Sequence, residues 1–496
     1  PQVSGDAASL YQTRCASGDL GDIIILDNAD MQDCVDVGLI ADISEDLPNY
    51  ENLMKYEEQI SLFNDAINEV IGKEGVYAIP AEMNSNGPTE YKEDTVYTMP
   101  RLEWDHYVEV GAPEMKNLDD LLDTLKKIQD AYPTNEAGDK TYALSLWPDW
   151  DNTSIENVNQ LTKWYGQEVN GSILLGTDNS ITPLTDKDGA YYKMLKFLYK
   201  ANQMGMVDPD SATQDWNAAC DKMRQGRVHL FWYNWQYGFW NSPDKGEARQ
   251  NYRGIPLEDL NIYQASDTYY GDGRAWAVGS NVSDEDKARI LEFMDWLCSP
   301  EGLTMQHIGQ EGFVYTVNDD GTYTLTDVGM TRFADDPQVP EELGGGSWTD
   351  GNNQVNQWLV ASIEMNPETG ETFGSDYWAS FLEKNNTATN KEWSEKFGSE
   401  TEVSYLEENG MLNPVPSVNL VLPIDTTDIA LIRSQCGDQI KATSWQAIFA
   451  SDDAEFDKMW DEMCVTLEGL GWDQLVEFDT DKYQAVVDAR EAAVAE

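Results

Sequence analysis

The sequence predicts an α/β protein, because short apolar runs alternate along the chain with segments of helical periodicity. The chain has 496 residues, of which 41% are hydrophobic and 25% charged. This composition is typical of a globular protein, and at ~100–200 residues per domain the length indicates two or three domains. The longest apolar runs, such as residues 23–26, are far shorter than the ~18–20 residues of a membrane span.

The first strands are apolar runs bounded by turn residues. Residues 21–27 are predicted to form a buried strand entered from a glycine, and residues 75–80 a second strand closed by proline. A helix is predicted over residues 117–131, capped by Asn117, with several aspartates near its positive end. Its apolar face consists of Leu118, Leu121, Leu122, Leu125 and Ile128.

The second half of the chain begins with a predicted strand at residues 274–279. A helix follows behind the capping residue Ser283 and stops at Ser299-Pro300. Residues 330–415 are rich in Gly, Asn, Asp and Ser and are predicted to form loops and short helices. Two further helices are predicted near the C-terminus, one over residues 456–467 and one over about 479–495.

The charge balance excludes nucleic acid as a partner. The chain carries 90 acidic and 32 basic residues, a formal net charge of −58, and no basic stripe. Binding a polyphosphate requires clustered cations that release counterions. The six cysteines do not fall at the short spacings of a zinc or redox site, and we expect mainly buried free thiols, with one or two disulfides as the alternative.

The aromatic content points to ligand recognition. The chain has 17 Trp, 24 Tyr and 13 Phe. Protein cores favour aliphatic side chains because Trp is hard to bury completely, whereas surfaces that meet flat, half-polar ligands favour Trp and Tyr. Sugars are ligands of this kind, with an apolar face of C–H groups and hydroxyls at the edge.

The densest aromatic segment is residues 230–240, with seven aromatic side chains. A strand leading into a loop would place Trp232 and Asn234 on one face and spread Trp235 and later rings over the loop. The alternative is that the rings belong to the core, which we favour for Phe231 and Phe239. Because so many indole N–H groups are hard to satisfy in one core, we expect one or two rings to face a ligand.

Three further clusters supply candidate contacts. Residues 146–153 offer Trp147 and Trp150 as stacking platforms and Asp151 as a polar contact, with a turn carrying surface aromatics as an equally open alternative. In residues 269–276, Tyr270, Asp272 and Arg274 are candidates, although an internal Asp272–Arg274 salt bridge is the favoured alternative to ligand contact. The polar loop 81–87 adds Glu82 and Asn84.

Catalytic and metal motifs are missing from the sequence. It has no Walker loop, no Gly-x-Ser-x-Gly elbow and no His-Glu-x-x-His, and its three histidines are isolated and expected to be structural. The catalytic pair of carboxylates of a glycosidase can always be picked from 90 acidic residues, so the abundance of acids gives no evidence for that activity. Residues 135–139 lack the alternating carboxylates of a calcium loop. We therefore expect no cofactor, no metal and no enzymatic activity.

A series of segments resembles those of a known protein family. Residues 16–23, Ala-Ser-Gly-Asp-Leu-Gly-Asp-Ile, are similar to the "ASGDLPDI" segment of family 1 extracellular solute-binding proteins, the capture subunits of ABC-type sugar importers, with Gly21 in place of the usual proline. The series continues in order through most of the chain and matches the large, lipoprotein-type branch. Its further members are residues 38–43 ("GLIADL"), 75–80 ("G.YGIP"), 101–121 ("R.DW…G…T.DE"), 296–302 ("YLxSPEG") and 309–321 ("G.EG..Y…DG").

The resemblance implies a type II periplasmic-binding-protein-like fold of two lobes with a ligand cleft between them. By analogy, residues 1–100 and 265–330 would form the first lobe, and residues 101–264 and 331–496 the second. The four clusters would then lie at strand ends facing the cleft. The family normally begins with a strand and a helix that precede the matching segment, so we expect this chain to lack them, together with any signal peptide and lipid-anchor cysteine.

The expected function is that of a monomeric, non-enzymatic binding protein of a Gram-positive bacterium. It would be tethered as a lipoprotein to the outer face of the cytoplasmic membrane, capture an oligosaccharide and deliver it to the permease of an ABC transporter. Two alternatives remain: a glycoside hydrolase acting on the same sugars, and a binding protein for peptides or other small solutes. The high negative charge argues against an anionic sugar.

Overall fold

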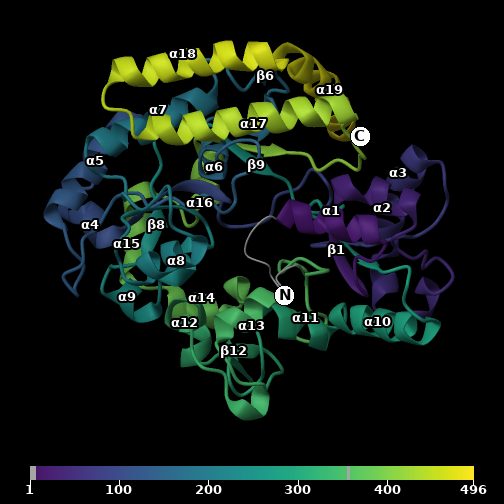
Figure 1. The fold of residues 1–496 in the computed structure, drawn as a ribbon. Helices are drawn as coiled ribbons and strands as arrows, with labels where there is room; N and C mark the ends of the chain where they lie inside the picture. Colours follow the sequence, from purple (N-terminus) through teal and green to yellow (C-terminus); the bar gives the residue numbers. More distant parts are fainter. Residues whose placement is uncertain (1–6, 355–357, 496) are drawn as a thin grey trace.

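The computed structural model describes residues 7–354 and 358–495 and is a mixed α/β protein, as predicted (Figure 1). All six cysteines are free, and four of them are buried, which confirms the preferred expectation for the thiols. In the described part of the chain, no helix combines the length and the apolar character that crossing a membrane requires.

A three-stranded antiparallel sheet organises the N-terminal region. Its strands, in spatial order, are β1 (Ile23–Asp27), β10 (Arg274–Val278) and β2 (Ile79–Pro80). Along β10, Ala275 and Ala277 pack in one hydrophobic core, while Trp276 and Val278 pack in another. The sheet therefore joins segments that are far apart in the sequence.

A strand forms at each of the three predicted positions, with two corrections. Within the predicted strand 75–80 only Ile79–Pro80 is a strand. The strand at the start of the chain was expected to be buried, yet Ile23 and Ile25 are each 41% exposed. The reason is that β1 lies at the edge of the sheet and packs on one face only, through Ile24 and Leu26.

Helices cover this sheet. They are α1 (Ala7–Ser17), α2 (Met31–Val37), α3 (Glu57–Ile71), α10 (Asp284–Leu297) and α11 (Pro300–His307). The hydroxyl of Ser283 accepts a hydrogen bond from the backbone N–H of Asp286 at 3.1 Å, which confirms the predicted cap of α10. Ser299 caps α11 in the same way, so the Ser-Pro signal ends one helix and begins the next.

The second region contains three small sheets. The first has strands β7 (Leu230–Tyr233), β3 (Thr98–Glu103) and β8 (Tyr252–Gly254), with β3 in the centre. The second has strands β4 (Gln167–Asn170), β5 (Ile173–Gly176) and β6 (Ile181–Pro183). The third is the parallel pair of β9 (Ile262–Ala265) and β13 (Leu412–Val415). The largest hydrophobic core draws its side chains from two stretches, residues 96–262 and 393–475.

Long helices enclose this core. They include α5 (Leu118–Ala131), α7 (Ala190–Gln203), α17 (Thr427–Ile448), α18 (Asp453–Leu470) and α19 (Trp472–Ala495). Shorter helices are α4 (Trp104–Glu109), α6 (Glu156–Thr162), α8 (Trp216–Arg224), α9 (Pro243–Glu247), α15 (Ala388–Phe397) and α16 (Glu402–Glu408). The yellow helices α17 and α18 run side by side along the top of Figure 1. The side chain of Asn117 accepts from two backbone N–H groups of α5, which confirms the predicted cap.

Two C-terminal helices differ from the prediction. The last helix begins at Trp472, earlier than expected, and the long helix α17 was not predicted individually. Its buried face contains Gly437, Thr443 and Ser444, so the apolar periodicity is weak. A Cβ on Gly437 would lie 3.0 Å from the backbone of Thr153, which shows how closely this helix packs.

A third, smaller body lies at the bottom of Figure 1. It contains the hairpin of β11 (Tyr315–Val317) and β12 (Tyr323–Leu325) with α12 (Asp327–Asp335), α13 (Trp348–Gln354) and α14 (Ala379–Asn385). Its core is formed by Ile308, Val314, Leu325, Trp348 and Trp378. Loops and short helices were predicted for this part of the chain.

Candidate ligand-binding site

Aromatic side chains from three separate segments form one contact network, which we call the aromatic cluster. It consists of Trp147, Trp150, Trp216, Trp232, Tyr233 and Trp235. Trp147 and Trp150 follow the segment at residues 142–144, which pairs with residues 207 and 228. Trp216 begins α8, and the other three rings lie on β7 and in the loop after it.

Trp147 and Trp232 form the base of the aromatic cluster. Their rings stack with centroids 5.4 Å apart and planes within 8°, and both residues are 0% exposed. The prediction that they serve as platforms is therefore wrong in this structure, because neither ring has a free face. Both belong to the largest core, where they support the rings above them.

Trp150, Trp216 and Trp235 form the outer part of the aromatic cluster. Trp150 is 37% exposed and packs against Trp216 at a centroid distance of 4.6 Å. The half-buried Trp235 stacks on Tyr233 at 4.6 Å and lies 6.0 Å from Trp150. The sequence reasoning missed Trp216, which stands alone in a polar segment and gives no local signal.

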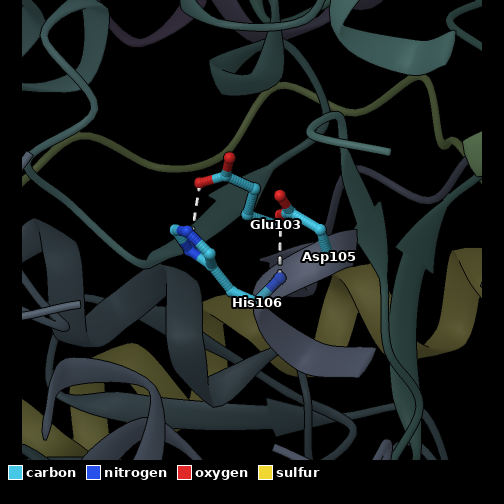
Figure 2. Close-up of side chains that lie close together, drawn as sticks. All are labelled: Glu103, Asp105 and His106. Carbon is cyan, nitrogen blue, oxygen red and sulfur yellow. Dashed lines mark hydrogen bonds and ion pairs between the residues drawn. The ribbon is translucent and has the colours of Figure 1, made fainter. Parts of the chain in front are cut away.

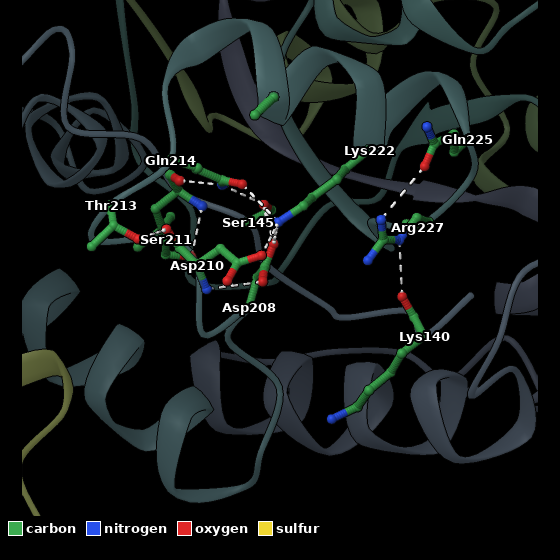
Figure 3. A network of polar contacts seen from close by, with 12 residues as sticks. Lys140, Ser145, Asp208, Asp210, Ser211, Thr213, Gln214, Lys222, Gln225 and Arg227 are labelled. Atoms are coloured by element: carbon green, nitrogen blue, oxygen red, sulfur yellow. Dashed lines mark hydrogen bonds and ion pairs between the residues drawn. The ribbon is translucent and has the colours of Figure 1, made fainter.

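A buried polar network fixes the chain beneath the aromatic cluster (Figure 3). The ammonium of Lys222 donates to Asp208 at 2.6 Å, to Asp210 at 2.9 Å and to the side-chain oxygen of Gln214 at 2.8 Å. The amide of Gln214 in turn donates to the backbone oxygen of Leu146, next to Trp147. Lys222 thus acts as a built-in cation that holds the segments carrying Trp147 and Trp216.

Five charged side chains that are linked by electrostatic interactions form a second group, which we call the charged cluster. It consists of Glu82, Glu93, Asp272, Arg274 and Asp376. Arg274 begins β10, and Asp376 lies in a short 3-10 helix. Glu82 follows β2 and adopts a positive φ of 61°, a conformation held by a 2.7 Å hydrogen bond from its N–H to Trp358 O. Arg274 contacts Asp272 through Nε at 3.1 Å and Nη2 at 2.5 Å, so the favoured alternative, an internal salt bridge, is present.

Burial dominates the electrostatics of the charged cluster, and nearby negative charge adds to it. Burial, with the nearby carboxylates Asp272 and Glu93, raises the pKa of Glu82 well above its usual range, and Arg274 opposes this only in part. Burial, followed by Asp267 and Asp376, raises the pKa of Glu93 to about 7. Asp376 itself is exposed to solvent.

Tyr237 lies in the loop after β7, two residues beyond Trp235, and interacts electrostatically with Asp376 of the charged cluster. Burial, then the charge of Asp376, raises the pKa of this phenol. Arg101 lies 5.9 Å from the centre of the Tyr237 ring and forms a fully buried 2.7 Å ion pair with Glu402. The loop that carries Trp235 therefore also borders the charged cluster, a junction that the sequence gave no means of predicting.

Two of the predicted polar contacts, Asn84 and Asp151, form hydrogen bonds within the protein. Asn84 is 1% exposed and bonds to Thr268 at 3.3 Å, and the two oxygens of Asp151 accept from Trp445 at 2.7 Å and from the N–H of Glu156 at 2.9 Å. Because Asn84 is buried, the structure corrects its assignment as a ligand contact, whereas the half-buried Asp151 stays a candidate contact.

The other two predicted contacts lie near the clusters without joining either. The half-buried Asn234 approaches Thr95 at 3.5 Å, and Tyr270 packs edge-on against Tyr269 with centroids 5.0 Å apart. Both remain candidate contacts.

Two of the three histidines have the structural role predicted for them. A ring nitrogen of His229 lies 3.2 Å from Tyr132 O, and one of His307 lies 2.9 Å from Val360 O. Burial lowers the pKa of each imidazole to about 4, so both rings are neutral at physiological pH.

Comparison with known proteins identifies the family of this chain. Residues 2–304 match the family described as bacterial extracellular solute-binding protein. The chain belongs to this family. No functionally curated protein matches the sequence.

Solved structures share the two-lobed fold of this solute-binding protein. The substrate-binding protein FusA of S. pneumoniae, an EF-hand mutant in complex with fructo-nystose, is 17% identical with a TM-score of 0.61. A solute-binding protein of Bifidobacterium longum infantis, described as HMO binding, is 15% identical with a TM-score of 0.58. The N-glycan transport protein NgtS of Streptococcus pneumoniae, with Man1GlcNAc, is 14% identical with a TM-score of 0.54. The alignments cover 97%, 99% and 98% of this chain and 92%, 92% and 90% of those chains.

Proposed function

We propose that this solute-binding protein captures an oligosaccharide and delivers it unchanged to the permease of an ABC transporter. The observation that carries the proposal is the outer part of the aromatic cluster, where Trp150 is 37% exposed beside the half-buried rings of Trp216 and Trp235. Structural relatives that are described with bound glycans support the same ligand class.

The physical basis is stacking between indole faces and the apolar faces of sugar rings. If a sugar covers half of a ~200 Å² ring at ~25 cal/mol/Å², each platform contributes roughly 2 kcal/mol. Two platforms with several hydrogen bonds from the charged cluster, less the cost of ordering, are sufficient for a dissociation constant of ~1 μM. Buried Trp147 and Trp232 keep the platforms in place before the ligand arrives.

We further propose that two lobes close over the sugar and that the permease recognises the closed state. The proposed division places residues 1–100 with 265–330 in one lobe and 101–264 with 331–496 in the other. Separate hydrophobic cores support it for most of the chain, but the core of the third body joins Leu325 to Trp348 and so crosses the boundary at residue 330. Residues 359–373 pack with the core of the first lobe, so we assign this stretch to that lobe as well.

The cellular setting is part of the same proposal. The family is extracellular, and we propose a lipoprotein monomer on the outer face of the cytoplasmic membrane of a Gram-positive bacterium. We also propose that the protein binds without turnover.

A calorimetric and glycan-array screen tests the function. We expect micromolar binding of one oligosaccharide class and no chemical change of the glycan during long incubation. Release of a shorter sugar that one carboxylate replacement abolishes would establish a glycoside hydrolase instead. Binding confined to peptides or other small solutes would reject the sugar ligand.

A further inference from the structure

Glu103, Asp105 and His106 bring three potential metal ligands together at the end of β3 (Figure 2). One carboxylate oxygen of each acid and a ring nitrogen of the histidine all lie within 4.8 Å of one another. This group is outside both the aromatic cluster and the charged cluster. The sequence reasoning treated His106 as an isolated structural residue.

Two of the potential metal ligands, the Glu103 carboxylate and His106 Nδ1, belong to side chains that are buried or largely buried and make few hydrogen bonds. The side chain of Glu103 is only 6% exposed, and its one described polar contact is Nδ1 of His106 at 3.1 Å. The same Nδ1 is buried and has no partner with hydrogen-bond geometry among the described residues. A buried carboxylate and a buried imidazole nitrogen thus face each other without a well-formed hydrogen bond, which is costly for both groups.

Among the described residues, no basic side chain outside the group itself is in ion-pair contact with its two carboxylates. The nearest basic group that influences Glu103 is Lys245. Its ammonium donates instead to Trp240 O at 2.9 Å and lies 3.5 Å from the centre of the Trp240 ring. Within the described residues, no Lys or Arg forms an ion pair with Glu103 or Asp105.

The geometry suits a small divalent ion. Zinc bonds of ~2.0–2.2 Å in a tetrahedral site place neighbouring donor atoms about 3.4 Å apart. The 3.1 Å between Glu103 and His106 already approaches this separation, and rotation of the Asp105 carboxylate would close the remainder. Oδ1 of Asp105 also accepts from the backbone N–H of His106 at 2.8 Å, which keeps the carboxylate beside the histidine.

Neighbouring rings hold the imidazole in place. The ring of Tyr132 packs on His106 with centroids 3.6 Å apart, and the ring of His229 lies edge-on at 5.6 Å. Fixing the orientation of a ligating histidine in this way contributes to metal affinity. A mixed set of one imidazole and two carboxylates favours zinc over calcium, which prefers six to eight oxygens.

We propose that Glu103, Asp105 and His106 bind one Zn²⁺ ion, with water as the fourth ligand, and that the ion fastens β3 to α4. This proposal does not depend on the identity of the transported solute.

Zinc titration of metal-free full-length protein by calorimetry and thermal unfolding tests the proposal. We expect one site, with a rise in Tm on adding Zn²⁺, and at least tenfold weaker binding in Glu103→Gln and His106→Ala. The control is His307→Gln, which removes a different imidazole and is expected to bind zinc like the unmodified protein. Equal binding by all four proteins would show that surface carboxylates hold the metal and would overturn the proposal.

Crystals soaked in zinc provide a second measurement that needs no variant. Anomalous scattering at the zinc edge is expected to give a peak between Glu103, Asp105 and His106. Absence of a peak there at saturating zinc would overturn the proposal even if the variants failed to fold.

Discussion

The aromatic cluster and the charged cluster border the same loop but are stabilised in opposite ways. In the aromatic cluster, Trp147 and Trp232 stack in the core and the outer rings pack on them. Ring packing stabilises this folded arrangement even though both buried indole N–H groups lack a partner with hydrogen-bond geometry among the described residues. In the charged cluster, burial is the largest cause that raises the pKa of Glu82 and of Glu93, and the charge of Glu93 adds to the rise at Glu82 and that of Asp376 to the rise at Glu93. The first cluster is therefore prepared for ligand binding, while the second is expected to respond to pH and to charge.

The largest expected effect concerns Lys222, whose hydrogen bonds hold the segments that carry the aromatic cluster. Lys222→Met removes the ammonium that Asp208, with only 1% of its side chain exposed, contacts at 2.6 Å. Leaving a buried carboxylate unpaired typically costs about 3–5 kcal/mol in unfolding free energy. Chemical denaturation measures the loss, and we expect glycan affinity to fall with it because the Trp147 and Trp216 segments lose their anchor.

The matched control is Lys458→Met, which breaks an exposed pair with Glu462 at 3.7 Å. A pair of this kind is expected to contribute less than about 1 kcal/mol. Equal destabilisation by the two variants would contradict the role of Lys222 as a buried cation.

The second prediction concerns pH and the charged cluster. The native state holds the proton of Glu93 up to a pKa of about 7, whereas the unfolded chain releases it near 4.5. Between these pH values the native state binds more protons, so stability falls as pH rises, by about 2–3 kcal/mol for this group. Glu93→Gln is expected to match the unmodified protein at pH 4 and to be more stable by that amount at pH 8.

Unfolding free energies of both proteins across this pH range provide the measurement. A constant difference at all pH values would show that Glu93 titrates normally.

The third prediction concerns the exposed rings. Trp150→Ala removes a stacking face and is expected to weaken glycan binding by roughly 2 kcal/mol, or about 30-fold, in addition to a loss of stability from the ring contacts that it removes. Phe293→Ala in α10 is the control, because Phe293 is 39% exposed against 37% for Trp150 and is expected not to affect binding. Unchanged affinity in Trp150→Ala, measured by calorimetry, would move the sugar site away from the aromatic cluster.

The smallest expected effect concerns the Asp272–Arg274 salt bridge. Because the Arg274 side chain is 42% exposed, losing the pair through Arg274→Gln is expected to cost less than about 1 kcal/mol in stability and in glycan binding. A loss of affinity greater than about tenfold would instead identify Arg274 as a direct ligand contact.

Local signals predicted the regular elements well. Asn117 and Ser283 cap their helices as expected, and the apolar runs near residues 23, 79 and 274 are strands of one sheet. Prediction was weaker for α17, because its buried face uses Gly437 and small polar residues where close packing replaces apolar periodicity.

The candidate site was predicted in part only. The concentration of Trp and Tyr located the aromatic cluster, yet two of the four chosen tryptophans are buried and Trp216 was missed. Whether a ring is exposed depends on which distant segments of the chain pack on it. The residues next to it in the sequence do not contain that information. Asp376 was missed for the same reason, since it comes from a short 3-10 helix far along the chain.

The sequence by itself determined the family, the helix caps, the main strands and the aromatic character of the protein, because these depend on residues close together in the chain. The tertiary structure alone decided which rings face outward, where carboxylates crowd and that Lys222 serves as an internal cation. These features arise from packing and desolvation among segments brought together only by folding.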